Sequence, residues 1–298
     1  MGAQGFLTAF ALLSCLGAGV LCLQGVAAAR YRGERLNVAA AGVALVCAVV
    51  ALVCFALRLG HWERLFGGFS NLTSPITLLL FAWVLFVAAA VVMLVCAARS
   101  EDGSVPRWCG VLAVVAGVVL AVCCALATHP YNKVTALTPD MWVLVLYYLA
   151  CAGTLGSFGS WALGAARGED TAGHARLALG CVAANAVLLG IYLGVFSLDH
   201  QAARTASQAV YAMATFTVGG TSGSVVGAAE RVGALLAGPG AALFWVGAVG
   251  VGLVVPATAG AVALARPGAR VRTVCAWVGL ACALAGFACC GMGLAALT

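Results

Sequence analysis

The sequence predicts an all-α membrane protein, an eight-transmembrane-helix bundle with both termini outside (N-out/C-out). Three observations predict this class: the composition, the length of the apolar runs and the placement of the basic residues. Of the 298 residues, 64% are hydrophobic and 8% are charged, and the mean hydropathy is +1.10. A soluble domain carries about 25% charged residues, because its exterior must be polar. The composition therefore indicates a protein whose solvent is the bilayer.

Eight apolar runs are long enough to cross a hydrocarbon core of about 30 Å, which takes about 20 residues of helix. They cover Gly5–Ala29, Val38–Gly60, Ser74–Ala98, Trp108–Thr128, Met141–Ala166, Ala175–Leu198, Pro239–Ala265 and Thr273–Leu297, within a single membrane domain over residues 1–298. Strands facing lipid would need the alternation of a closed barrel, which these runs lack. The first run has neither a basic leader nor a cleavage site, so we expect a retained span.

Pro75 at the head of the third run and Pro256 inside the seventh are tolerated in membrane helices, where they cap or kink. In the fifth run, glycines recur as Gly153, Gly156 and Gly159, with Gly164 after them. Because small residues let helices approach closely in lipid, we expect these glycines to form packing surfaces.

Several of the fourteen cysteines, such as Cys15 and Cys22, recur every seven residues within apolar runs. This spacing places them on one helix face, and no CxxC pair occurs. We therefore expect small hydrophobic side chains rather than disulfides or metal ligands.

The Lys and Arg residues predict the orientation. The first, third, fifth and seventh connections hold or border ten of them: Arg30, Arg32, Arg35, Arg99, Arg107, Arg167, Arg176, Arg266, Arg270 and Arg272. The longer even-numbered connections have five: Arg58, Arg64, Lys133, Arg204 and Arg231. Because cytoplasmic loops carry the excess of Lys and Arg, both termini should lie outside. Because these basic residues set the orientation of the spans, the net charge of +6 does not indicate nucleic-acid binding. We expect no nucleic-acid partner.

The densest polar cluster closes the second run, where Arg58, His61, Glu63 and Arg64 lie among aromatic residues. One interpretation is an interfacial anchor, with arginines that extend toward the headgroups and Trp62 at their depth. The other is a site for a membrane-borne ligand with a polar head and an apolar tail.

A second cluster, His129–Lys133 followed by Thr138–Trp142, joins the fourth and fifth runs on the same side. All four histidines lie at the ends of runs or between them, whereas membrane haem ligands lie deep in helices, so we expect no haem. No HExxH or GxSxG pattern occurs, so we expect no metal or nucleophilic hydrolytic site.

At these clusters the sequence resembles the membrane anchor subunit of the bacterial dimethyl sulfoxide reductase family. That family has a His-Leu-Gly-x-x-x-Arg-x-Phe motif after its second helix, which Leu59, Gly60, Arg64 and Phe66 match. The family also has a Tyr followed by Pro-x-Trp at its fifth helix, similar to Tyr131, Pro139 and Trp142 with one extra residue between Pro and Trp.

The resemblance implies a bacterial cytoplasmic (inner) membrane protein that holds two partners, a molybdopterin catalytic subunit and an iron–sulfur subunit, against the outer face. It implies that the chain oxidises menaquinol there, carries no redox cofactor of its own, and passes electrons to the iron–sulfur subunit. By this resemblance the quinol site comprises Arg58, His61, Arg64, Tyr131 and Trp142. His61 is the catalytic base, because imidazole accepts protons near neutral pH. The arginines stabilise developing negative charge.

The chain departs from the family at three places. Arg58 stands where the family has its His, and the nearest His is His61, three residues on, which returns to the same face if the helix continues. Where the family's third helix has an acidic residue, this chain has the apolar Leu78–Leu80. Phe287–Cys290 replaces a Gly-Glu…Gly-Arg motif in the last run.

Three alternatives stay open: a polysulfide-reductase-type quinone-binding subunit, a transporter or lipid-handling protein, and a purely structural membrane protein. A transporter should show ionisable residues or broken helices near the midplane, where the sequence has almost none. The long connection Asp199–Arg231 is interpreted either as a cover over a partner or the quinol site, or as a flexible tether with part of a surface helix.

Overall fold

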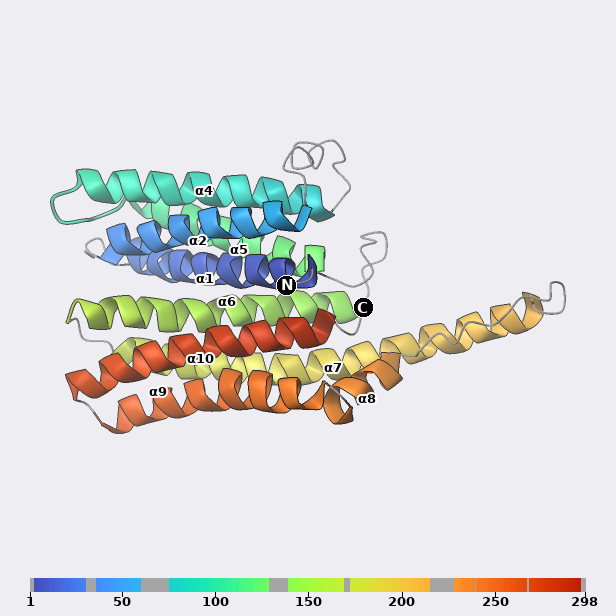
Figure 1. Cartoon of the computed structure of the whole chain (residues 1–298). Helices are drawn as coiled ribbons and strands as arrows, with labels where there is room; N and C mark the ends of the chain where they lie inside the picture. Colours follow the sequence, from blue (N-terminus) through green and yellow to red (C-terminus); the bar gives the residue numbers. More distant parts are fainter. Residues whose placement is uncertain are drawn as a thin grey trace.

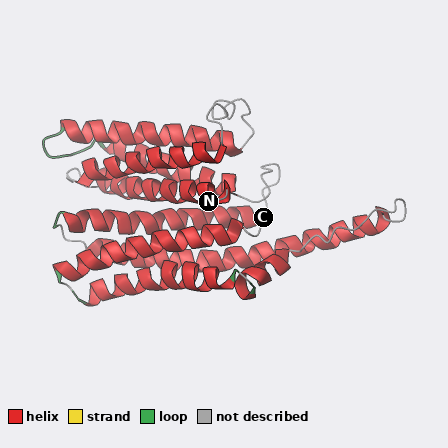
Figure 2. Ribbon diagram, viewed as in Figure 1, coloured by secondary structure: helices red, strands yellow, loops and turns green. Residues whose placement is uncertain are grey.

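The computed structural model of the chain describes residues 3–30, 36–59, 75–128, 139–168, 172–214, 228–238, 240–266 and 268–295. Within these ranges every regular element is a helix (Figure 2). They are α1 (Ala3–Arg30), α2 (Leu36–Leu59), α4 (Pro75–Arg99), α5 (Arg107–Thr128), α6 (Pro139–Ala166), α7 (Ala172–Ala214), α8 (Ala228–Ala237), the π-helix η1 (Leu243–Val254), α9 (Val255–Ala265) and α10 (Ala269–Ala295).

In the described residues, eight helices are long and apolar enough to cross a membrane, which confirms the predicted all-α bundle of eight spans. The first observed span is Gly5–Arg30 and the last is Ala269–Gly293. In the seventh, Leu243–Ala265, η1 and α9 follow one another without a break. The chain is a multi-pass membrane protein.

The spans form two groups of four in chain order (Figure 1). Helices α1, α2, α4 and α5 pack together in one group, while α6, α7, the η1–α9 helix and α10 pack together in the other. The groups meet mainly where α1 lies against α6, and α1 also contacts α10. Among the described helices, α4 packs substantially only against α2 and α5. It therefore lies at the edge of the bundle.

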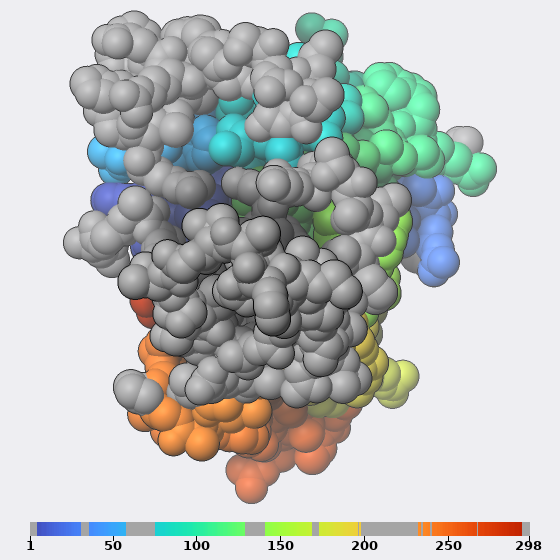
Figure 3. All heavy atoms as spheres, turned by 90° about the vertical axis from the view of Figure 1, so that its right-hand side faces the viewer, coloured from blue at the N-terminus to red at the C-terminus, as the bar shows by residue number. Residues whose placement is uncertain are grey.

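The two ends of the bundle differ. At one end, which we call the arginine-rich end, α1 leads to α2, α4 to α5, α6 to α7, and α9 to α10 (Figure 1). Both chain termini lie at the opposite end, the terminal end, where α2 and α5 finish and α4 and α6 begin. Figure 3 looks onto the terminal end, with the first group of spans in its upper part and the second group below. Short connections and basic residues therefore gather at one end of the bundle.

Close packing of the two groups depends on glycine. A Cβ atom added to Gly19 of α1 would overlap the backbone of Ala152 in α6, and one added to Gly156 would overlap the backbone of Gly19. At Gly159, an added Cβ would lie 2.7 Å from the Val20 Cγ2 atom. Because dispersion contacts replace hydrophobic attraction between helices in lipid, this approach stabilises the α1–α6 interface. The expected packing role of Gly156 and Gly159 is confirmed.

All fourteen cysteines are free thiols, and each is buried or half-buried. Cys15 is fully enclosed in the core, and Cys22 directs its thiol toward the Val114 carbonyl at 3.4 Å. They fill space between helices as small hydrophobic side chains, as the seven-residue spacing predicts.

Three features differ from the sequence-based expectation. Helix α7 does not end near Leu198 but continues to Ala214, beyond the other spans (Figure 1). A short helix, α8, precedes the seventh span, and the Trp245 indole N–H donates a hydrogen bond of 2.8 Å to the Leu236 carbonyl of α8. The seventh span itself begins as a π-helix, a geometry that the sequence did not predict.

Candidate functional site

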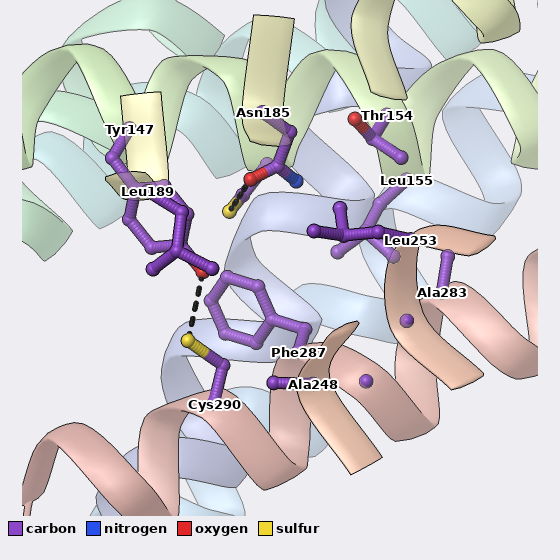
Figure 4. Close-up of a pocket in the computed structure, with 13 residues that line it drawn as sticks. Tyr147, Thr154, Leu155, Asn185, Leu189, Ala248, Leu253, Ala283, Phe287 and Cys290 are labelled. Atoms are coloured by element: carbon purple, nitrogen blue, oxygen red, sulfur yellow. Dashed lines mark hydrogen bonds between the residues drawn. The ribbon is translucent and has the colours of Figure 1, made fainter. Parts of the chain in front are cut away.

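The described residues enclose a small polar cavity within the second group of spans. It lies among α6, α7, η1 and α10, near the middle of the bundle, and its volume is about 20 Å³. A cavity of this size has room for about one water molecule. Its polar lining consists of Tyr147, Cys151 and Thr154 from α6, Asn185 from α7 and Cys290 from α10 (Figure 4).

Two hydrogen bonds cross between helices at this cavity. The Tyr147 hydroxyl donates to the Cys290 sulfur at 3.1 Å, which joins α6 to α10. The Cys151 thiol donates to the Asn185 side-chain oxygen at 3.6 Å, which joins α6 to α7. The Thr154 hydroxyl donates to the Ala150 carbonyl of its own helix at 2.9 Å, so its lone pairs remain for an acceptor role. These bonds give the polar groups hydrogen-bond partners, which lipid cannot provide.

The π-helix forms one wall of the cavity through Ala248, Gly252 and Leu253. Pro256, the second residue after η1, lacks the N–H that would bond the Gly252 carbonyl in an α-helix. At the end of η1, the Val255 N–H instead bonds the Gly250 carbonyl, five residues back. A Cβ at Gly252 would lie 2.6 Å from the Gly286 Cα atom, so this wide helix can approach α10 only because both positions are glycine. The close approach of this wall to α10 thus depends on Gly252 and Gly286, and Pro256 lies just beyond it.

The cavity has polar groups from three helices but room for only about one water molecule. Its lining includes no carboxylate, guanidinium, ammonium or imidazole group. A site for a charged solute needs such groups, and a solute larger than water needs more space. The cavity therefore fits a structural water at the junction of four spans.

Most of the predicted quinol site falls outside the described residues. His61, Arg64 and Tyr131 are in segments 60–74 and 129–138, which the structure does not describe. Arg58 lies in the last turn of α2, and its side chain is also outside the described part. Trp142 is the fourth residue of α6, with 54% of its surface exposed on the outside of the bundle.

The helix ends that flank these segments do lie together. Helices α2 and α5 finish at the terminal end, α4 and α6 begin there, and α2 contacts α4 and α6 while α5 contacts α4 and α6. The two motif segments thus connect four neighbouring helices at one end of the bundle.

The internal cavity was not predicted from the sequence. Asn185 is an amide in the middle of an apolar run, and a buried polar group in a span needs a partner. That signal marks Asn185 as a residue of interest. The partners in α6 and α10 could not be named, because they depend on which spans face each other.

Comparisons with known protein families, with curated protein sequences and with solved structures find no match for this chain.

Proposed function

We propose that this chain is the membrane anchor subunit of a quinol-dependent molybdopterin oxidoreductase similar to the dimethyl sulfoxide reductase family. In this role it binds menaquinol near the outer face, takes its electrons and passes them to an iron–sulfur partner subunit. The molybdopterin and the iron–sulfur clusters belong to the partner subunits, where the terminal acceptor is reduced. The chain supplies the quinol site and the attachment to the membrane.

One observation carries the proposal. The two segments that resemble the family's motifs follow α2 and precede α6, and the helix ends that flank them lie at the same end of the bundle (Figure 1). A quinol site needs residues from both segments within reach of one ring. Because these flanking helix ends share one end of the bundle, both segments are attached there.

The chemistry of quinol oxidation accounts for the residue types in these segments. Menaquinol releases two electrons and two protons as it becomes menaquinone. His61 accepts a proton from a ring hydroxyl, because imidazole titrates near neutral pH. Arg58 and Arg64 stabilise the negative charge that develops on the ring oxygen. Tyr131 donates a hydrogen bond to the other oxygen. The protons go to the outer water and the electrons go to the nearest cluster of the partner.

The extension of α7 supports attachment of a partner at this end. Beyond Val195, where the span ends, the helix runs to Ala214. At 1.5 Å per residue this part is roughly 30 Å long, about the thickness of a second hydrocarbon core. It projects from the terminal end (Figure 1) and lies beyond the apolar span, where a water-soluble partner can contact it.

The same proposal sets the orientation. With the arginine-rich end in the cytoplasm of a bacterial inner membrane, the terminal end faces outward. Accessibility labelling of single cysteines introduced after Leu59 and after Arg99, in a chain freed of its native cysteines, tests this. The label should reach the first from outside and the second only after permeabilisation, and the reverse pattern would overturn the orientation.

The experiment that tests the function begins with the chain purified from its own membranes in a mild detergent. The proposal predicts that an iron–sulfur protein and a molybdenum-containing protein accompany it, and that the preparation oxidises menaquinol. A chain that purifies alone, free of iron and molybdenum under conditions that preserve its fold, would contradict the proposal.

A further inference from the structure

A groove at the arginine-rich end lies outside the site proposed above. It is formed where α4 leads into α5, has a volume of about 850 Å³ and opens to the surroundings. Its polar lining comprises Arg99, Arg107, Ser100 and Ser104, and Trp108 forms an aromatic wall. Helix α4 is at the edge of the bundle, so this groove lies at the periphery of the arginine-rich end.

The turn that carries the groove is held in one conformation by hydrogen bonds. The hydroxyls of Ser100 and Ser104 lie 2.8 Å apart, and the Ser104 N–H donates to the Ser100 hydroxyl at 3.2 Å. Gly103, with φ of 66°, adopts a backbone conformation that favours glycine. The buried Asn37 side chain of α2 donates to the Gly103 carbonyl at 2.9 Å, which fastens the turn to the bundle. The two arginines therefore project from a fixed support.

Each arginine lies at the end of a row of exposed valine side chains on its helix, which we call a valine ridge. Arg99 shares a face of α4 with Val95 and Val91, at four-residue intervals, and all three side chains are exposed. On α5, Arg107 shares a face in the same way with Val111 and Val115, which are 54% and 49% exposed. Both ridges run from the groove along their spans toward the middle of the bundle.

The charges at the groove are available to a ligand. Within the part of the chain that the structure describes, no carboxylate forms an ion pair with Arg99 or Arg107. Glu101 and Asp102, at the exposed tip of the turn, are the nearest acidic residues in sequence, and neither lines the groove. Two guanidinium groups with two hydroxyls match the oxygens of a phosphate, which arginine binds through paired hydrogen bonds.

We infer that this groove binds an anionic glycerophospholipid. The phosphate lies between Arg99 and Arg107 and accepts a hydrogen bond from Ser104, while the acyl chains lie along the two valine ridges. Trp108 lies at headgroup depth, where tryptophan is enriched in membrane proteins. A free phosphate ion would use the arginines but not the ridges. Basic pockets between spans are a known mode of headgroup recognition. This site is independent of the proposed quinol chemistry.

The test uses the full chain purified in detergent and the melting temperature measured with added lipid. Phosphatidylglycerol should raise the melting temperature, while phosphatidylcholine and inorganic phosphate should not. The variant Arg99→Gln/Arg107→Gln should bind phosphatidylglycerol at least roughly tenfold more weakly in a titration, because two charge-assisted contacts are lost. The variant Arg99→Lys/Arg107→Lys, which keeps the charge, should retain part of the effect.

A matched control is Arg266→Gln/Arg270→Gln, which removes two exposed arginines from the same end and should leave the lipid effect intact. The inference is overturned if the Arg99→Gln/Arg107→Gln variant responds to phosphatidylglycerol as the wild type does. It is also overturned if phosphatidylcholine stabilises equally, since charge would then not matter. An equal effect of inorganic phosphate alone would overturn it as well, by identifying a simple anion site instead.

Discussion

The Tyr147 hydroxyl donates a hydrogen bond to the Cys290 thiol at 3.1 Å, and this bond joins α6 to α10 in the second group of spans. Both residues are buried, and they line the same small cavity as Asn185. Because lipid offers no hydrogen-bond partner, the Tyr147 hydroxyl needs one within the protein, and Cys290 provides it.

We expect Tyr147→Phe to destabilise the protein by about 0.5–1.5 kcal/mol, the usual net contribution of one hydrogen bond. A double-mutant cycle with Cys290→Ala separates the bond from the change in packing. The measurement is unfolding of the purified chain in mixed micelles by a denaturing detergent. A coupling energy near zero would show that the two side chains do not interact.

The α1–α6 interface gives a second prediction. Gly156→Ala places a methyl group against the Gly19 backbone, and overpacking of this kind costs about 1–3 kcal/mol. Gly180→Ala and Gly190→Ala, where a Cβ meets nothing within 4 Å, serve as matched controls on α7. These should be neutral or slightly stabilising, because alanine is a better helix former. Equal melting temperatures for all three variants would contradict the close approach.

Trp142 gives a prediction on the quinol site. It is exposed at the start of α6, and the family resemblance assigns it to the quinol site. Trp142→Ala should raise the KM for menaquinol several-fold with little change in stability. Trp277→Ala is the control, because Trp277 is 49% exposed on α10 toward the arginine-rich end. If both variants show the wild-type KM, Trp142 is an interfacial anchor and not part of the site.

The projecting part of α7 gives a prediction on assembly. Ala206→Pro should break the helix beyond the membrane, because proline removes a backbone donor and clashes with the preceding turn. The partner subunits should then be lost from the purified chain, while membrane insertion is unchanged. Ala206→Ser, which keeps the helix, should retain them. Full retention of the partners in the proline variant would mean that they attach elsewhere.

The eight spans were predictable because about 20 apolar residues are required wherever a helix crosses lipid. The end of α7 was not, since hydropathy marks where the membrane ends and not where the helix ends. Sequence after Leu198 is polar but rich in alanine, a strong helix former, so the helix continues to Ala214.

The internal cavity depends on tertiary packing. The sequence shows Asn185 and Pro256, but not that α6, α7, η1 and α10 meet around them. Glycines allow η1 to approach α10 closely, and hydropathy does not reveal its π-helical geometry. By contrast, the quinol site was predicted from short motifs in the connections, and it stays a prediction.

Quinol oxidation by this chain is best tested through the reduction of the partner's iron–sulfur clusters. The purified complex is mixed with menaquinol without oxygen, and the reduced clusters are followed by electron paramagnetic resonance. His61→Ala and Arg64→Ala should slow this reduction by about a hundredfold or more, the usual effect of losing a general base or charge stabilisation. Dithionite should still reduce the clusters fully, and Asn185→Leu should behave as the wild type. Wild-type rates in both the His61 and Arg64 variants would show that menaquinol is not oxidised at this site.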